Sequence, residues 1–151
     1  MTHPMKQYPP RPAVTKEIVL EAATSVAEDI GYETNPKDIV TAFENCGHYR
    51  PDGYELAKFM DDNFGWQIDI RDVNKLDEMS EKVNQLWNEE CKKWFSENNI
   101  QPPFEIGTEL KQGTITGIYH YEPGVYKVQD ESRKGSNHLL LIKFEDAELP
   151  A

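Results

Sequence analysis

The chain has 151 residues, 38% of them hydrophobic, and it has a formal net charge of −11 with a pI near 4.8. This length suits one domain or two very small ones with a buried core. The surplus of acidic side chains disfavours direct binding to nucleic acid or to a membrane surface, and it favours a partner with a basic surface. An acidic surface that only keeps the protein soluble would explain the same charge, so this alternative stays open.

Residues 1–13 contain four prolines and are predicted to form an extended, proline-rich arm. Proline fixes the φ angle and favours the polyproline II conformation, so a regular folded element is not expected here. Residues 9–12 have the loose proline spacing of peptides that bind aromatic grooves. A passive tail is the simpler interpretation of such a weak pattern.

Three short helices are predicted over residues 15–30, 35–46 and 52–64. Apolar residues recur in them at spacings of three and four, which places these side chains on one helical face. Each helix starts at a residue that can cap its N-terminus and stops at a glycine. The capping residues are Thr15, Asn35 and Asp52, and the glycines are Gly31, Gly47 and Gly65.

A fourth, long helix is predicted over residues 69–98, because the apolar periodicity continues without a glycine or a proline. Asp69 or Asp72 can cap its N-terminus. The four helices together predict a small helical bundle, a domain of residues 14–98. Two cysteines, Cys46 and Cys91, occupy apolar helical positions, where reduced buried thiols are expected.

Residues 98–103 contain two asparagines and two prolines, which end the long helix. From Phe104 onward the apolar residues alternate with period two, which predicts four short strands. Pro123 and Gly124 fit the central positions of a type II turn. Closure into a small β-barrel would remove the exposed strand edges, so residues 104–149 are expected to form a barrel domain. The fold class is therefore α+β.

This C-terminal part resembles a bacterial SH3-like small barrel of the KOW or Tudor-like kind. The resemblance rests on four segments: F-x-x-G-T-x-L from Phe104, G-x-I-x-G-I-Y from Gly113, P-G-x-Y-x-V from Pro123 and L-L-I-x-F-E-D-A-E-L from Leu140. It implies a binding fold for peptides, nucleic acids or protein assemblies. Residues 104–151 contain 8 acidic and 5 basic side chains, which disfavours nucleic acid as the ligand. The helical part resembles no family.

The short linker of residues 98–103 predicts that the two parts are docked, because its two prolines make it stiff. The expected contact lies between Trp94 and Phe95 at the end of the long helix and Phe104 and Ile106 at the start of the barrel.

No group of residues has the spacing of a specific catalytic or metal site. Cys46, His48 and Cys91 offer three metal ligands, whereas a structural zinc site needs four, and a thiol–histidine pair can be written for many chains. Core thiols and a loop histidine are the simpler interpretation. We therefore expect no cofactor and no metal.

The acidic density of the helical part is the feature that points most clearly to a partner. Residues 52–97 contain 12 acidic and 6 basic side chains, and the apolar stripe must face the core, so the carboxylates gather on the outer surface. Aromatic and arginine side chains are common anchors at interfaces. The predicted partner-binding residues are Asp61, Asp62, Asp69, Asp72, Asp77, Glu78, Glu81, Tyr49, Arg50, Tyr119 and Tyr121.

Three functions follow in order of preference. The first is a non-enzymatic interaction protein, in its sharpest form a phage- or plasmid-type inhibitor that mimics nucleic acid and blocks a host DNA- or RNA-binding enzyme. The second is a nucleic-acid-associated regulator with a helix-turn-helix-like bundle, although its third helix offers only Lys58 beside Asp61 and Asp62. The third is a small hydrolase with an unrecognised site. A cytoplasmic location is expected, since no signal peptide and no long apolar run is present. The sequence leaves the oligomeric state open.

Overall fold

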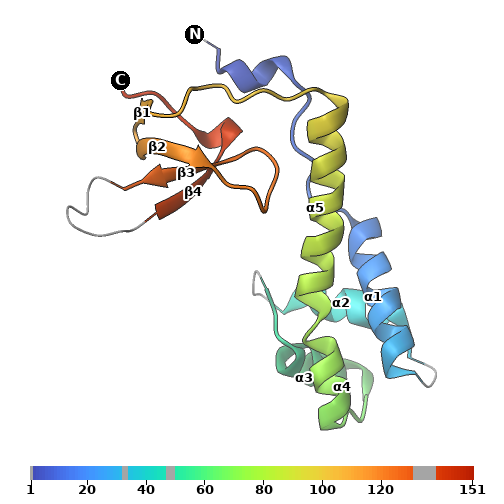
Figure 1. The fold of residues 1–151 in the computed structure, drawn as a ribbon. Helices are drawn as coiled ribbons and strands as arrows, with labels where there is room; N and C mark the ends of the chain where they lie inside the picture. Colours follow the sequence, from blue (N-terminus) through green and yellow to red (C-terminus); the bar gives the residue numbers. More distant parts are fainter. Residues whose placement is uncertain (1, 32–33, 47–49, 131–138) are drawn as a thin grey trace. The chain divides into compact units, whose positions relative to one another are not determined.

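The computed structural model describes residues 2–31, 34–46, 50–130 and 139–151 (Figure 1). Within these residues the fold is α+β, with five α-helices and a four-stranded antiparallel sheet. The chain divides into two compact units. Ala13–Trp87 form one, here called the helical unit, and Met1–Pro12 with Asn88–Ala151 form the other, here called the sheet unit. This division differs from the predicted one, because the N-terminal arm and the end of the long helix belong to the sheet unit.

The helical unit contains α1 (Lys16–Ile30), α2 (Pro36–Asn45), α3 (Gly53–Phe64), α4 (Ile70–Leu76) and the first part of α5 (Met79–Glu97). The three predicted N-caps are confirmed, since the side chains of Thr15, Asn35 and Asp52 accept hydrogen bonds from backbone N–H groups of the first turns. Gly31 and Gly65 end α1 and α3 as predicted. The predicted end of α2, Gly47, lies outside the described residues.

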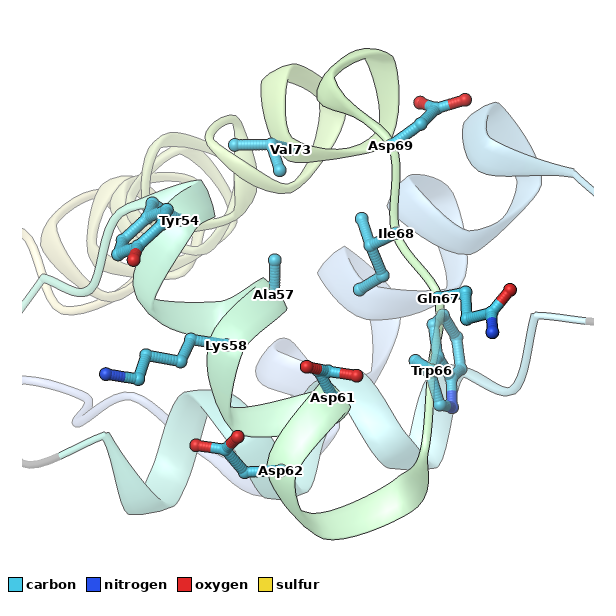
Figure 2. A pocket seen from close by; sticks show the side chains of 10 residues that line it. All are labelled: Tyr54, Ala57, Lys58, Asp61, Asp62, Trp66, Gln67, Ile68, Asp69 and Val73. Carbon is cyan, nitrogen blue, oxygen red and sulfur yellow. The ribbon is translucent and has the colours of Figure 1, made fainter.

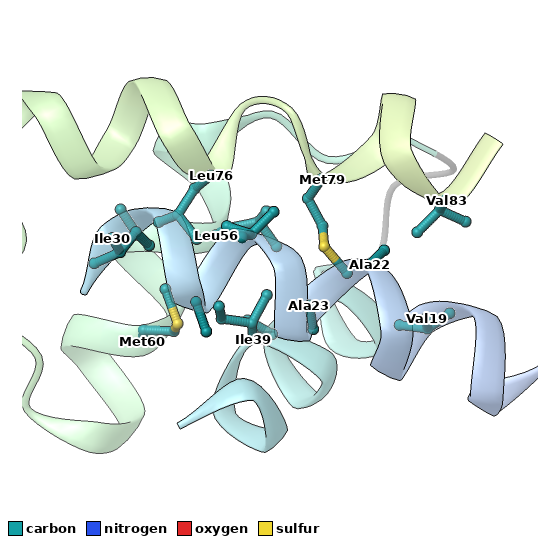
Figure 3. Close-up of a cluster of buried hydrophobic side chains, with 14 of the residues drawn as sticks. Val19, Ala22, Ala23, Ile30, Ile39, Leu56, Met60, Leu76, Met79 and Val83 are labelled. Atoms are coloured by element: carbon teal, nitrogen blue, oxygen red, sulfur yellow. The ribbon is translucent and has the colours of Figure 1, made fainter. Parts of the chain in front are cut away.

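The core of the helical unit forms where α1 packs against α2 and α4, and α3 packs against α2 and α4. Figure 3 shows its buried side chains meeting between these helices. The alanines Ala22, Ala23 and Ala42 are buried as well, and their small side chains let neighbouring helices approach closely. The largest fully buried side chains of this core are Ile39, Leu56, Met60, Leu76, Met79 and Val26.

The prediction of one uninterrupted helix over residues 69–98 is wrong, because Asp77 and Glu78 form a turn between α4 and α5. At this turn an oxygen of Asp77 accepts a hydrogen bond from the N–H of Gly53 at 2.9 Å. The backbones are in direct contact there: a Cβ on Gly53 would lie 2.0 Å from the Val73 carbonyl oxygen. The start of α3 thus occupies the space beside the turn, a tertiary contact that the apolar periodicity does not encode.

The sheet unit contains η1 (Pro4–Gln7), the second part of α5, and the strands β1 (Glu109–Leu110), β2 (Gly113–Ile118), β3 (Val125–Gln129) and β4 (Leu139–Lys143), followed by η2 (Phe144–Asp146). The strands pair in the order β1-β2-β3-β4 (Figure 1). Gly124, with a φ of 69°, precedes β3 as the predicted type II turn requires. Pairing between β1 and β4 is not seen in the described residues, so the sheet is open.

The core of the sheet unit joins residues from both ends of the chain. The rings of Tyr126 and Phe144, both fully buried, lie in contact with centroids 4.5 Å apart and planes tilted by 40°. The predicted contact of the helix end with the strands is present, since Trp94 is buried and Phe104 packs against the same cluster. Ile106 does not take part, because 64% of it is exposed. Other members of the cluster are Met5, Ile100, Leu110, Ile115, Val128 and Ala147.

The N-terminal residues are not the passive extended arm that their prolines predict. Pro4–Gln7 form one turn of 3₁₀ helix, capped by the imidazole of His3, which accepts the Met5 N–H at 3.1 Å. Met5 is only 7% exposed and lies in the core of the sheet unit. The arm is therefore part of this unit.

Candidate partner-binding groove

An open groove of about 740 Å³ lies in the helical unit, between α3 and the segment that leads into α4. Figure 2 shows the side chains that line it, with α3 on one side and the segment from Trp66 to Asp69 on the other. Ala57, Ile68 and Val73 give it an apolar lining. Its remaining members are Tyr54, Lys58, Asp61, Asp62, Trp66, Gln67 and Asp69.

Local sequence signals position both sides of this groove. Gly65 ends α3 in the left-handed conformation, with a φ of 69°, and turns the chain back along the helix. Trp66 is then fixed by its indole Nε1, which donates to Asp38 Oδ2 at 3.0 Å. Asp69 closes the segment as the N-cap of α4, since its Oδ1 accepts the N–H groups of Arg71 at 2.9 Å and of Asp72 at 3.1 Å.

The charge at the groove is predominantly negative. Asp61 and Asp62 occupy adjacent exposed positions on α3, Asp69 lies across from them, and Lys58 is the one basic residue that lines the groove. Tyr54, at the edge of the groove, is 66% exposed. Exposed carboxylates beside an apolar lining suit a ligand that has cationic and apolar groups close together.

The structure brings three of the predicted partner-binding residues, Asp61, Asp62 and Asp69, to this one groove. Asp77 has a structural use instead, because it accepts the N–H of Gly53 at the turn between α4 and α5. The other predicted residues of the helical unit do not line the groove. Asp72 is half-buried, Arg50, Glu78 and Glu81 are exposed, and Tyr49 lies outside the described residues.

Tyr119 and Tyr121 follow β2 in the sheet unit and form a pair with ring centroids 5.4 Å apart. Tyr121 is 79% exposed, and its carbonyl oxygen accepts a hydrogen bond from Asn88 Nδ2 at 3.2 Å. Tyr119 is half-buried, so the exposed aromatic surface of this pair is mainly that of Tyr121.

Both thiols are free; Cys91 is buried as expected, whereas Cys46 is only half-buried. Burial raises the pKa of Cys46, which donates to the Glu55 carbonyl at 3.7 Å, and the nearby charges of Glu55 and Asp52 raise it further. Burial also raises the pKa of Cys91, although Arg11 beside it partly opposes this effect. A raised thiol pKa keeps the neutral form dominant at neutral pH. His48 lies outside the described residues.

Among the described residues, no three His, Cys, Asp or Glu side chains come together in a way that would hold a metal ion. Nor does any helix in this part of the chain have the length and apolar character needed to cross a bilayer.

Sequence reasoning missed two features that the structure makes clear. Tyr54, Trp66 and Ile68 line the acidic groove together, and the sequence pattern did not bring these three residues to one site. Arg11 is bound by Glu145, 134 positions away, and no local pattern connects the two. The prolines around Arg11 were the one sequence feature that pointed to a binding role for this segment. They indicate an extended peptide, but they do not identify the residues that bind it.

Comparison with known proteins finds no matching family, no similar curated protein and no similar solved structure.

Proposed function

We propose that this is a non-enzymatic, cytoplasmic interaction protein whose helical unit binds a basic segment of a partner protein in the acidic groove. The observation that supports this proposal is the juxtaposition of Asp61 and Asp62 with the apolar lining of Ile68 and Val73. A lysine- or arginine-bearing amphipathic segment would place its apolar side chains on the lining and its cationic groups beside the two carboxylates. The exposed ring of Tyr54 would cover one end of such a segment.

The sharper proposal, an inhibitor that mimics nucleic acid, requires carboxylates arranged so as to occupy a basic channel. The turn at Asp77 and Glu78 divides the predicted acidic row between α4 and α5, and Asp69 and Asp77 already accept backbone hydrogen bonds. Such mimicry therefore centres on α3, where Asp61 and Asp62 are exposed and make no such cap. A phage- or plasmid-type inhibitor of a host enzyme fits this chemistry as one member of the proposed class.

Capture from a bacterial lysate tests the proposal with a matched pair of variants. Asp61→Asn/Asp62→Asn removes two charges at the groove, and Glu21→Gln/Glu44→Gln removes two exposed charges of α1 and α2 in the same unit. We expect wild type and the second variant to retain the same basic protein at low salt, and the groove variant to lose it. High salt should release it from wild type and from the second variant, because exposed charges are screened. Equal retention by both variants would contradict binding at the groove. If no basic protein is retained by wild type at low salt, the electrostatic proposal is wrong.

We further propose that the sheet unit is an SH3-like small barrel completed by the C-terminal segment. The segment after η2 returns to the turn between β1 and β2, where the Lys111 N–H donates to the Glu148 carbonyl at 2.8 Å. Gln112 Nε2 donates to the Asp146 carbonyl at 2.7 Å beside it. Amide hydrogen exchange tests this closure: the Lys111 amide should be protected in the full chain, and exchange at the rate of an open turn would contradict it.

A further inference from the structure

The N-terminal arm is fastened to the sheet unit by the side chain of Arg11. Its Nε and Nη2 donate to the two carboxylate oxygens of Glu145 at 2.7 and 3.0 Å, a bidentate pair. Its Nη1 donates to the Pro123 carbonyl at 2.7 Å and Nη2 to the Gly124 carbonyl at 2.9 Å. The guanidinium also lies 4.8 Å from the ring centroid of Trp94. The side chain of Arg11 is only 7% exposed.

This arrangement is selective for arginine. A planar guanidinium matches a carboxylate, two carbonyl oxygens and an aromatic face at once, whereas a lysine ammonium matches only one or two of these groups. Burial by itself lowers the pKa of Arg11, but the hydrogen bonds and charge of Glu145 outweigh burial and raise it. Gly124 leaves room for the guanidinium of Arg11, because a Cβ at Gly124 would lie 2.7 Å from Arg11 Nη2.

The rest of the arm is held both through its backbone and through its side chains. Trp94 Nε1 donates to the Pro9 carbonyl at 2.8 Å, and the imidazole of His3 bonds the Ala147 carbonyl at 2.7 Å. Between these points a cavity of about 460 Å³ lies beside the arm, lined by Met5, Tyr8 and Trp94 among others. The arm is thus held at separate points and does not fill its cleft.

We propose that this cleft, formed by Trp94, Glu145 and the Pro123–Gly124 turn, is a recognition site for an arginine-bearing, proline-rich peptide of a partner protein, and that residues 3–12 occupy it as an internal ligand. The arm supplies the chemistry of that partner: it contains Lys6 and Arg11, no acidic residue, and the prolines that favour an extended backbone. This site lies in the sheet unit and is independent of the acidic groove.

An internal ligand can be displaced by a competing segment that makes the same contacts. Ala13 and Val14, which follow the arm, are exposed. Because the arm is covalently attached, its effective concentration exceeds that of a free peptide. A partner segment therefore competes only if it binds the cleft more tightly than the arm or is present at high local concentration.

Cutting the tether in the otherwise complete chain tests this site. A specific protease recognition sequence inserted between Pro12 and Ala13 allows cleavage after folding, so that every residue is still present. A fluorescent peptide of residues 1–12 is then titrated into the cut protein and its anisotropy recorded. Peptides with Arg11→Lys and Arg11→Ala, and the protein variant Glu145→Gln, test the anchor, while circular dichroism reports whether the sheet unit stays folded.

We expect the labelled peptide to bind and to be displaced by unlabelled peptide. Arg11→Lys should weaken binding at least about tenfold and Arg11→Ala more than about thirtyfold, and Glu145→Gln should weaken the wild-type peptide. If the sheet unit unfolds once the cut arm dissociates, refolding on addition of the peptide would also support the site. Equal affinity of the Arg11→Ala peptide, a folded cut protein that binds no peptide, or unfolding that peptide does not reverse would each overturn the proposal.

Discussion

At the scale of single residues, Gly53 shows how one missing side chain shapes the helical unit. The conformation of Gly53 needs no glycine, but a Cβ would lie 2.0 Å from the Val73 carbonyl oxygen and 2.7 Å from the Asp77 nitrogen. Both atoms belong to the backbone, so they cannot rotate away. The glycine is thus required by the close approach of α3 to the turn between α4 and α5.

Gly53→Ala should therefore lower the free energy of unfolding by about 1–3 kcal/mol, because α3 and α4 must move apart to admit the methyl group. Gly117→Ala is the matched control, since no atom lies within 4 Å of the position of its added Cβ. Urea denaturation of both variants checks this. If Gly53→Ala lowers the free energy of unfolding no more than Gly117→Ala does, the turn between α4 and α5 can move to accommodate the methyl group at little cost.

Tyr126 has a comparable role in the sheet unit, through its hydroxyl group. The hydroxyl donates to the Phe104 carbonyl at 2.8 Å and accepts the Phe104 N–H at 2.9 Å, while the residue is fully buried. Burial raises the pKa of Tyr126, although the bond to Phe104 partly opposes the shift. The neutral phenol of Tyr126 is therefore the form that bonds the backbone N–H and carbonyl of Phe104.

Tyr126→Phe should lower the free energy of unfolding by about 1–3 kcal/mol, because it leaves two backbone groups of Phe104 without a partner. Tyr121→Phe, at a position 79% exposed, removes the same atom where water can replace it. Thermal unfolding of the two variants side by side measures the difference. Equal midpoints would mean that water enters and satisfies residue 104.

At the scale of elements, the helices could be predicted from the sequence wherever the determining signal is local. Thr15, Asn35 and Asp52 cap their helices because a side-chain oxygen bonds an N–H two or three residues later, so the start is encoded within one turn. The turn at Asp77 and Glu78 could not be predicted, since it depends on contact with Gly53, which lies 24 positions earlier. Apolar periodicity continues across that turn because Leu76 and Met79 both face the core.

The candidate sites were predictable only in part for the same reason. Charge counts place Asp61 and Asp62 on an exposed helix face, but the opposing wall at Trp66 and Ile68 exists only after Gly65 has reversed the chain. The prolines of the arm indicate extended backbone, yet the partner of Arg11 on η2 is set by tertiary folding. Long-range pairs of this kind leave no periodic trace in the sequence.

The contact between the arm and η2 has a defined pH dependence. Burial by itself raises the pKa of Glu145, but the hydrogen bonds and charge of Arg11 outweigh this effect. The pKa of Glu145 is therefore lowered from its ordinary value of 4.5. A carboxyl whose folded pKa is lowered stabilises the fold at pH values above its unfolded pKa, and this stabilisation disappears as the pH falls through the folded pKa.

Wild type should accordingly be more stable than Glu145→Gln at neutral pH, and the difference should shrink as the pH drops below 4.5. Urea denaturation of the two proteins at a series of pH values measures this difference directly. A difference that stays constant into the acid range would show that the charge of Glu145 contributes nothing through Arg11.

At the scale of the whole molecule, the sheet unit is assembled from segments that the sequence predicts to be separate. The sheet unit takes Met5 from the arm and Trp94 and Ile100 from around the end of α5 into one core with the strands. Its stability therefore depends on residues outside 104–151. A small sheet of this size has little apolar area of its own to bury.

Residues 104–151 expressed alone should fail to unfold cooperatively, because Met5, Trp94 and Ile100 are missing from their core. Thermal unfolding followed by near-ultraviolet circular dichroism checks this, with the intact chain as reference. A sharp transition near that of the intact chain would show that the strands and η2 are sufficient.

The central claim is that the acidic groove of the helical unit binds a basic segment. Its most direct measurement is a nuclear magnetic resonance titration of the isotope-labelled full chain with an amphipathic helical peptide made of lysine and leucine. We expect the largest shifts at Tyr54, Ile68 and the indole N–H of Trp66, weakened by salt and by Asp61→Asn/Asp62→Asn but unaffected by Glu21→Gln/Glu44→Gln. Shifts spread over the acidic surface, or equal in both variants, would contradict the claim.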